Sequence, residues 1–171
     1  MSEVSEVKDV VGAAQVALSQ AMGYCAEKTR LGNAQAVIDC LRRGDGQVCG
    51  YWHYSIAKQV AESLGTLDQN VKAAYTYLYD ATPEDVCFGE AAKALPVHLM
   101  VWTERKTAAL NALVETWDRA LALHYAEMIG GHQPSQLLDV QVVDSNEVEK
   151  RIGYGALLSS LHHAPIQVWQ R

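Results

Sequence analysis

Apolar residues recur at alternating spacings of four and three near the start of the chain, which predicts a helix with one buried stripe over about residues 4 to 27. The stripe comprises Val7, Val11, Ala14, Leu18, Ala21 and Cys25. A second helix is expected after Asn33, a residue type that caps helix N-termini. It should end at Gly44, because glycine tolerates the left-handed conformation there and the preceding Arg42 and Arg43 suit the negative end of the helix dipole. This helix would bury Val37, Cys40 and Leu41.

The stretch CGYWHYSIAKQVAESLG, residues 49 to 65, concentrates aromatic, thiol and imidazole side chains. A helix from about Tyr51 to Leu64, ended by Gly65, explains most of the residues, because it places apolar and polar side chains on different faces. Trp52 and Tyr54 would then point to its flanks. The face predicted to be apolar holds His53, Ile56, Ala57, Val60 and Leu64, with Cys49 near it at the helix entrance.

Residues 67 to 79 fit two patterns. Thr66 and Gln69 form a capping-box pattern that favours a helix, whereas the alternating, tyrosine-rich end favours a strand, and we predict a strand over residues 71 to 79. The sequence ATPED then predicts a helix start, with Thr82 as N-cap and Pro83 at the first helical position.

After Pro96, the apolar run VHLMVW predicts a buried strand. From about Thr103 the spacing becomes helical again, up to Gly130 and Gly131. The stripe of this long helix comprises Leu110, Val114, Trp117, Leu121, His124 and Met128.

The C-terminal part predicts two more strands with a helix between them. LLDVQVVD reads as a strand, and Asp144 with Glu147 forms a capping-box analogue that starts a helix through about Leu161. PIQVWQ, from Pro165, is the last strand. Helices first, then strands interleaved with helices, imply an α+β fold in which a helical N-terminal part packs on a small sheet with covering helices. We expect a single domain over residues 1 to 171, helical to about residue 66 and α+β from about residue 67.

Composition narrows the class of protein. About half of the 171 residues are apolar (49%) and 20% are charged, as in globular proteins. A net charge of −6 and scattered basic residues argue against a nucleic-acid partner. The start lacks the basic and apolar regions of a signal peptide, and no apolar run approaches the length of a membrane span. We therefore expect a soluble cytoplasmic protein without a membrane partner, with reduced cysteines and no cofactor.

Cysteine and histidine supply the first candidate chemistry. Cys40, Cys49 and His53, with Cys87 or another histidine as a fourth, are residue types that bind zinc. Cys49 and His53 are close enough to meet if the helix begins early, but the eight residues between Cys40 and Cys49 match no compact ligand pair, so we predict no metal site. Cys49 or Cys87 near a helix start is a candidate nucleophile, since the helix dipole lowers a thiol pKa. The alternative interpretation is that these are packed core thiols.

Histidines and carboxylates at element junctions supply the second candidate. A cluster of His98, His124 and a carboxylate such as Glu104 or Asp144 would orient an imidazole for acid or base catalysis. The alternative is that the histidines are satisfied within the core and that Asp80, Glu104 and Asp144 are caps or solvated ends. His53, Cys49 and His124 are thus the candidate catalytic residues.

An aromatic set offers the leading hypothesis for a ligand site, because binding pockets are mostly apolar with a few polar anchors. It comprises Tyr51, Trp52, Tyr54, Tyr75 and Tyr77, continued by Tyr79. The alternative is packing between sheet and helix with hydroxyls at the rim. The hypothesis requires that the tyrosines face one cavity.

The helical stripes can pack on each other or pair with a second copy, and the last strand can extend a sheet, so we expect a homo-oligomer, most simply a homodimer. The interpretation we favour is a protein that binds a small molecule or a protein partner. One alternative is a small metal-dependent or hydrolytic enzyme with a His/Cys/carboxylate site. Another is a structural subunit of a larger assembly.

Overall fold

The structure is a computed structural model that describes residues 3–76, 96–160 and 165–171, with side chains described from residue 9 onward. Its helices are α1 (Glu3–Thr29), α2 (Ala34–Arg43), α3 (Gly46–Leu67), α5 (Ala108–Ile129) and the short α6 (Ser145–Lys150), followed by a 3₁₀ helix, η1 (Gly153–Ser159). Its strands are β1 (Val71–Thr76), β2 (Val97–Thr103), β3 (Leu138–Asp144) and β4 (Ile166–Gln170). The predicted α+β fold is confirmed.

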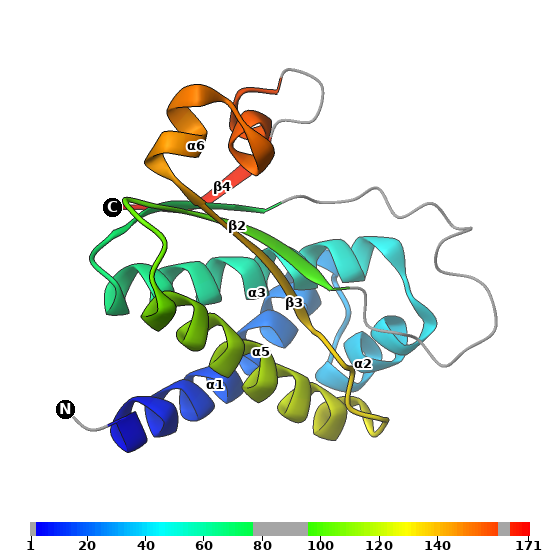
Figure 1. The fold of residues 1–171 in the computed structure, drawn as a ribbon. Coiled ribbons are helices and arrows are strands. Elements are labelled where there is room, and N and C mark those ends of the chain that lie inside the picture. Colours follow the sequence, from blue (N-terminus) through cyan, green and yellow to red (C-terminus); the bar gives the residue numbers. More distant parts are fainter. Residues whose placement is uncertain (1–2, 77–95, 161–164) are drawn as a thin grey trace.

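The described strands form one mixed sheet in the order β3-β2-β1-β4. β1 pairs antiparallel with both β2 and β4, whereas β2 and β3 run parallel and are connected through α5. Helix α3 packs directly against the sheet, and α1 and α5 complete the helical layer on that side (Figure 1). The small α6 and η1 lie on the opposite side of the sheet in Figure 1. Because β4 is last in the strand order, it occupies one edge of the described sheet.

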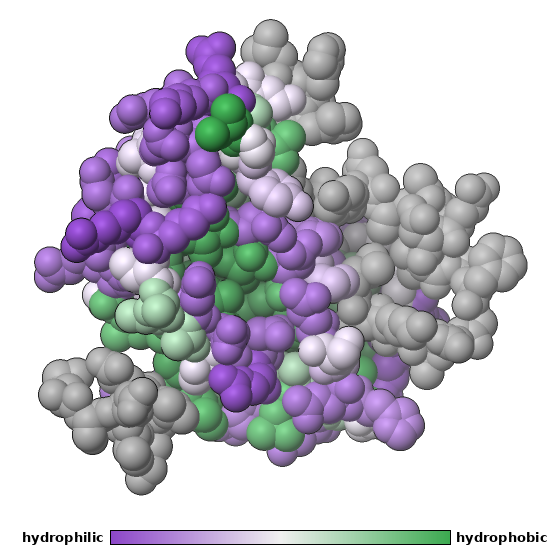
Figure 2. Space-filling model, in the orientation of Figure 1, coloured by the Kyte–Doolittle hydropathy of each residue, from purple (hydrophilic) through white to green (hydrophobic). Residues whose placement is uncertain are grey.

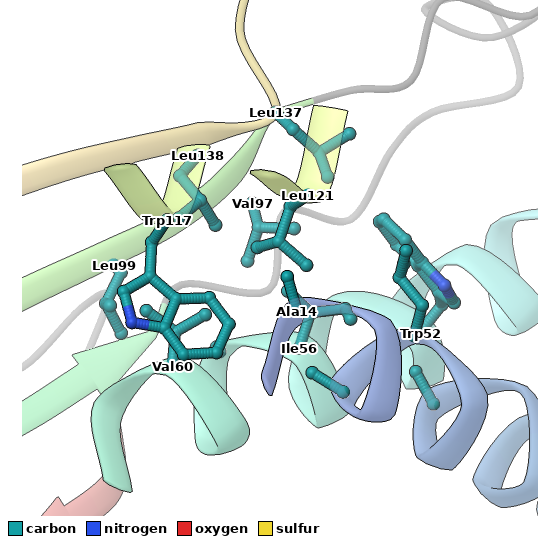
Figure 3. Close-up of a cluster of buried hydrophobic side chains, with 14 of the residues drawn as sticks. Ala14, Trp52, Ile56, Val60, Val97, Leu99, Trp117, Leu121, Leu137 and Leu138 are labelled. Carbon is teal, nitrogen blue, oxygen red and sulfur yellow. The ribbon is translucent and has the colours of Figure 1, made fainter. Parts of the chain in front are cut away.

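The core lies between the helical layer and the sheet (Figure 3). Trp52, Ile56 and Val60 of α3 belong to this core, together with Trp117 and Leu121 of α5 and apolar residues of β2 and the start of β3. The α1 and α5 stripes, which sequence alone allowed to face a second copy, are largely buried inside one chain. No helix among the described residues is both long and apolar enough to cross a bilayer.

Local capping chemistry sets several boundaries as predicted. The Asn33 side chain accepts from the Ala36 amide at 2.9 Å, and Gly44 adopts the left-handed conformation that ends α2. The Asp144–Glu147 capping box is present at the start of α6. Residues 71–76 of the predicted strand are β1, and its remainder, like the expected helix start at Thr82, lies outside the described residues.

The third helix differs from its prediction at both ends. It begins at Gly46 rather than Tyr51, because Asp45 accepts from the Val48 amide at 2.9 Å and so caps an earlier turn. It continues to Leu67, so the prediction that Gly65 ends it is wrong. The predicted flank position of Trp52 is also wrong: its side chain is 1% exposed, because α1 and α5 cover the face of α3 on which it lies.

Two further predictions need correction. The prediction that Val11 belongs to the buried stripe of α1 is wrong, because its side chain is 40% exposed, whereas its neighbour Val10 is buried with 2% exposed. The helix that begins after Asp144 stops at Lys150 rather than near Leu161, since Arg151 takes a left-handed conformation (φ 53°) and the chain continues as η1.

Candidate ligand-binding groove

A groove of about 530 Å³ runs between the N-terminal half of α1 and the C-terminal half of α3. The two helices are antiparallel neighbours, since Cys25 near the end of α1 contacts Val48 near the start of α3. Helix α5 contributes Trp117 to the lining, and this side chain is 1% exposed. The other lining residues are Asp9, Val10, Ala13, Val16, Ala17 and Gln20 of α1 and Gln59, Glu62, Ser63, Thr66 and Leu67 of α3.

Apolar side chains form the base of the groove and part of its rim. Val10 and Ala17 are buried, whereas Val16 and Leu67 are 54% and 51% exposed. Hydrophobic surface is visible at the left of Figure 2, between the end of α3 and the start of α1. Large apolar side chains at such exposures lose the benefit of burial unless something covers them. A ligand lying in the groove would cover both.

The charges of the lining are negative. Asp9 on α1 and Glu62 on α3 are exposed carboxylates, and the lining residues that the structure describes include no lysine or arginine. Neither carboxylate forms an ion pair with a described side chain. The indole Nε1 of Trp117 is buried and has no hydrogen-bond acceptor among the described residues. The groove thus combines apolar surface with unneutralised negative charge.

The described members of the predicted aromatic ligand set do not line this groove. Tyr51 and Tyr54 instead pack on Tyr24 of α1, with ring centroids 5.9 and 6.0 Å apart. Trp52 points into the core, where its ring lies 5.2 Å from that of Tyr125. Tyr75 lies on β1, opposite Met100 and Gln167 of the neighbouring strands. Tyr77 and Tyr79 lie outside the described residues. The described members of the set therefore divide among three surroundings.

Burial keeps the thiols of Cys25 and Cys49 protonated. It raises the pKa of Cys25 from 9.0 to about 12, with a smaller contribution from Cys49. Burial, followed by the charges of Asp45 and Cys40, raises the pKa of Cys49 from 9.0 to about 11. These shifts oppose thiolate formation, on which nucleophilic catalysis by cysteine depends. Cys87 lies outside the described residues.

The described residues contain no group of three His, Cys, Asp or Glu side chains arranged to hold a metal ion. Cys49 interacts electrostatically with both Cys25 and Cys40. Arg43 donates a hydrogen bond to the sulfur of Cys40 at 3.3 Å. The His53 ring lies 5.6 Å from that of Trp52. The features are those of packed side chains at the junction of α1, α2 and α3.

The other two candidate histidines, His98 and His124, each pair with a carboxylate that was not predicted from the sequence. The Nδ1 atom of His98 on β2 lies 2.9 Å from Asp139 on the adjacent β3, and Gln141 donates to the other oxygen of Asp139 at 2.9 Å. His124 lies 3.1 Å from Glu127, one turn along α5. Glu104 instead pairs with Lys72, and Asp144 caps α6.

Comparison of the chain with protein-family models, with curated proteins and with solved structures gives no match.

Sequence reasoning missed the groove and Tyr24. The apolar character of Val16, which falls outside the predicted α1 stripe, was a signal for the groove. No local pattern predicted the exposed position of Leu67, because this position depends on where α3 ends. Only the pairing of α1 with α3 brings the two side chains to one surface.

Proposed function

We propose that the protein binds a small molecule with an apolar body in the groove between α1 and α3. The observation that carries the proposal is the presence of two half-exposed apolar side chains, Val16 and Leu67, on the same groove that contains the buried Trp117. The volume of about 530 Å³ falls within the range of ligand pockets, roughly 300–1,000 Å³. Its lining is also typical, with apolar residues and a few polar groups.

The alternative of a His/Cys/carboxylate enzyme has less support. Cys49 carries a raised pKa, so its thiol is protonated at neutral pH. His124 lies beside Glu127, away from the lining of the groove. The dyad of His98 and Asp139 is the arrangement most similar to an acid–base pair, but it belongs to the sheet and not to the groove. Binding uses the concave surface directly and requires none of these groups to react.

Predictions about partners and location accompany this proposal. A homodimer would be formed through a surface other than the buried α1 and α5 stripes, and β4 at the edge of the described sheet is the element we favour for it. The net charge of −6 supports the absence of a nucleic-acid partner. The free thiols of Cys25, Cys40 and Cys49 among the described residues support a reducing, cytoplasmic location, to be tested by localisation of the tagged full chain.

The binding test compares two valines of the same helix. Val16 lies on the groove and Val11, 40% exposed, does not. Dodecyl maltoside, an uncharged probe used below its micelle concentration, should bind the wild-type chain saturably in isothermal titration calorimetry. Val16→Asn should weaken binding about three- to tenfold, because it removes on the order of 1 kcal/mol of apolar contact. Val11→Asn should leave the dissociation constant unchanged.

Three results would overturn the proposal. The first is absence of saturable binding, and the second is equal weakening by the two substitutions. The third is a dimer in sedimentation equilibrium that Val16→Asn dissociates and Val11→Asn does not, since a second copy of the chain would then occupy the groove.

A further inference from the structure

We infer that the ligand of the α1–α3 groove is a cationic amphiphile: an apolar chain or ring system that carries an ammonium group. This inference rests on the proposed function and adds the chemical class of the ligand. Its basis is the charge of the groove, which is separate from the apolar surface used above.

The two acidic side chains lie on different helices of the groove. Asp9 belongs to the first turns of α1, and Glu62 belongs to the C-terminal part of α3. Because α1 and α3 are antiparallel, these two regions are neighbours. A cation in the groove would therefore meet negative charge from two helices, whereas an anion would meet no compensating lysine or arginine among the lining residues.

Carboxylates elsewhere on the described surface frequently have basic partners. Asp39 pairs with Arg42, Glu115 with Arg119, and Glu104 and Glu147 each with a lysine. Asp9 and Glu62 have no such partner among the described side chains, although both lie beside apolar surface. A ligand ammonium group would supply the missing positive charge while its apolar part covers Val16 and Leu67.

The polar part of the lining is compatible with this head group. Gln20, Gln59 and Ser63 carry oxygen atoms that can solvate a cationic head group directly or through its hydration water. The Thr66 hydroxyl donates to the backbone carbonyl of Glu62 at 2.8 Å, so it is already used within α3. The two carboxylates therefore provide the charge selectivity, and the side chains of Gln20, Gln59 and Ser63 provide uncharged polar contacts.

The test uses three probes that share a dodecyl tail and differ in the charge of the head group. They are dodecyltrimethylammonium, dodecyl maltoside and dodecyl sulfate, each used below its micelle concentration. We expect the cationic probe to bind about two- to fivefold more tightly than the uncharged one for each carboxylate engaged. The anionic probe should bind most weakly. The preference for the cation should decrease as the salt concentration rises, because both carboxylates are exposed to solvent.

Charge-removing variants locate the selectivity. Glu62→Gln and Asp9→Asn should each reduce the ratio of cationic-probe affinity to dodecyl maltoside affinity about two- to fivefold. The matched control is Glu149→Gln, which removes an exposed carboxylate of α6 that does not line the groove. It should preserve the preference.

The possible results separate the inference from the proposed function. Equal affinity for the cationic and uncharged probes, with weaker binding of both to Val16→Asn, would overturn the inference and retain the groove as a binding site. An equal effect of Glu149→Gln and Glu62→Gln would also overturn it, since attraction to the net charge would then be the cause. Failure of all three probes to bind saturably would overturn the proposed function itself.

Discussion

Gly65 provides the most demanding test of the packing around the groove. It lies inside α3 and is buried beneath the indole ring of Trp169 on β4. A Cβ atom added at Gly65 would lie 2.6 Å from Cε2 of that ring and closer still to Cζ2 and Cη2. The ring has to shift to accommodate Gly65→Ala, and Arg171, whose guanidinium lies 5.5 Å from the ring, also donates to the Gly65 carbonyl. The substitution therefore perturbs the contact between the sheet edge and α3.

Two opposing effects set the expected magnitude. Replacing glycine with alanine inside a helix stabilises it by roughly 1 kcal/mol. Overpacking a close contact costs roughly 1–3 kcal/mol. The overlap with three ring carbons, rather than with the end of a flexible side chain, places the cost in the upper part of that range. We expect Gly65→Ala to lower the free energy of unfolding by about 1–2 kcal/mol.

Gly50 is the matched control, because it lies in the same helix with no atom within 4 Å of an added Cβ. Gly50→Ala should raise the free energy of unfolding by about 0.5–1 kcal/mol in urea titrations with an unchanged m value. In a Trp169→Ala background, which removes the ring, Gly65→Ala should become stabilising. Equal stabilisation by Gly65→Ala and Gly50→Ala in the wild-type background would refute the close contact between Gly65 and Trp169.

Two further predictions concern the buried thiols of Cys25 and Cys49 and the hydrogen bonds between Asp118 of α5 and the start of β3. Cys25 and Cys49 have pKa values of about 12 and 11 in the folded protein, so they stay protonated at pH values where unfolded thiols of pKa 9.0 ionise; their contribution to stability should be fully present below pH 9 and be lost as the pH rises from 9 to 12. Urea unfolding across this range should show a smaller fall in the free energy of unfolding for Cys25→Ala than for the wild-type chain, and an equal fall would contradict the raised pKa of Cys25. Asp118 of α5 accepts from the amides of Leu137 and Leu138 at 2.7 and 2.8 Å. Asp118→Ala should lower the free energy of unfolding by about 2 kcal/mol and Asp118→Asn by less, because asparagine keeps one acceptor oxygen; equal losses would contradict this role.

The parts of the fold that sequence predicted well depend on neighbours along the chain. Caps such as Asn33 and Asp144 act within one helical turn, and the stripe that includes Leu110 and Trp117 repeats within one helix. The errors arose where tertiary contacts decide. The pattern around Trp52 suggested a helix with one buried face, whereas α3 is covered by the sheet and by two other helices.

The candidate site was harder to predict for the same reason. Val16 and Leu67 meet on one surface only because α1 and α3 are antiparallel neighbours, and no local pattern specifies that pairing. The contact between His98 and Asp139 likewise depends on the parallel register of β2 and β3, in which these residues are directly opposite. Sequence reasoning instead selected Glu104 and Asp144, which lie at strand ends but have other partners.

The most direct test of the central claim, that the α1–α3 groove binds a cationic amphiphile, follows the tryptophan indole N–H signals of the ¹⁵N-labelled full chain by nuclear magnetic resonance. The signal of Trp117, assigned by its loss in Trp117→Phe, should shift progressively and saturably as dodecyltrimethylammonium is added, because this side chain lines the groove. The signal of Trp52, buried beside Tyr125 and away from the lining, should remain in place. A stationary Trp117 signal, or an equal shift of both signals, would contradict the claim.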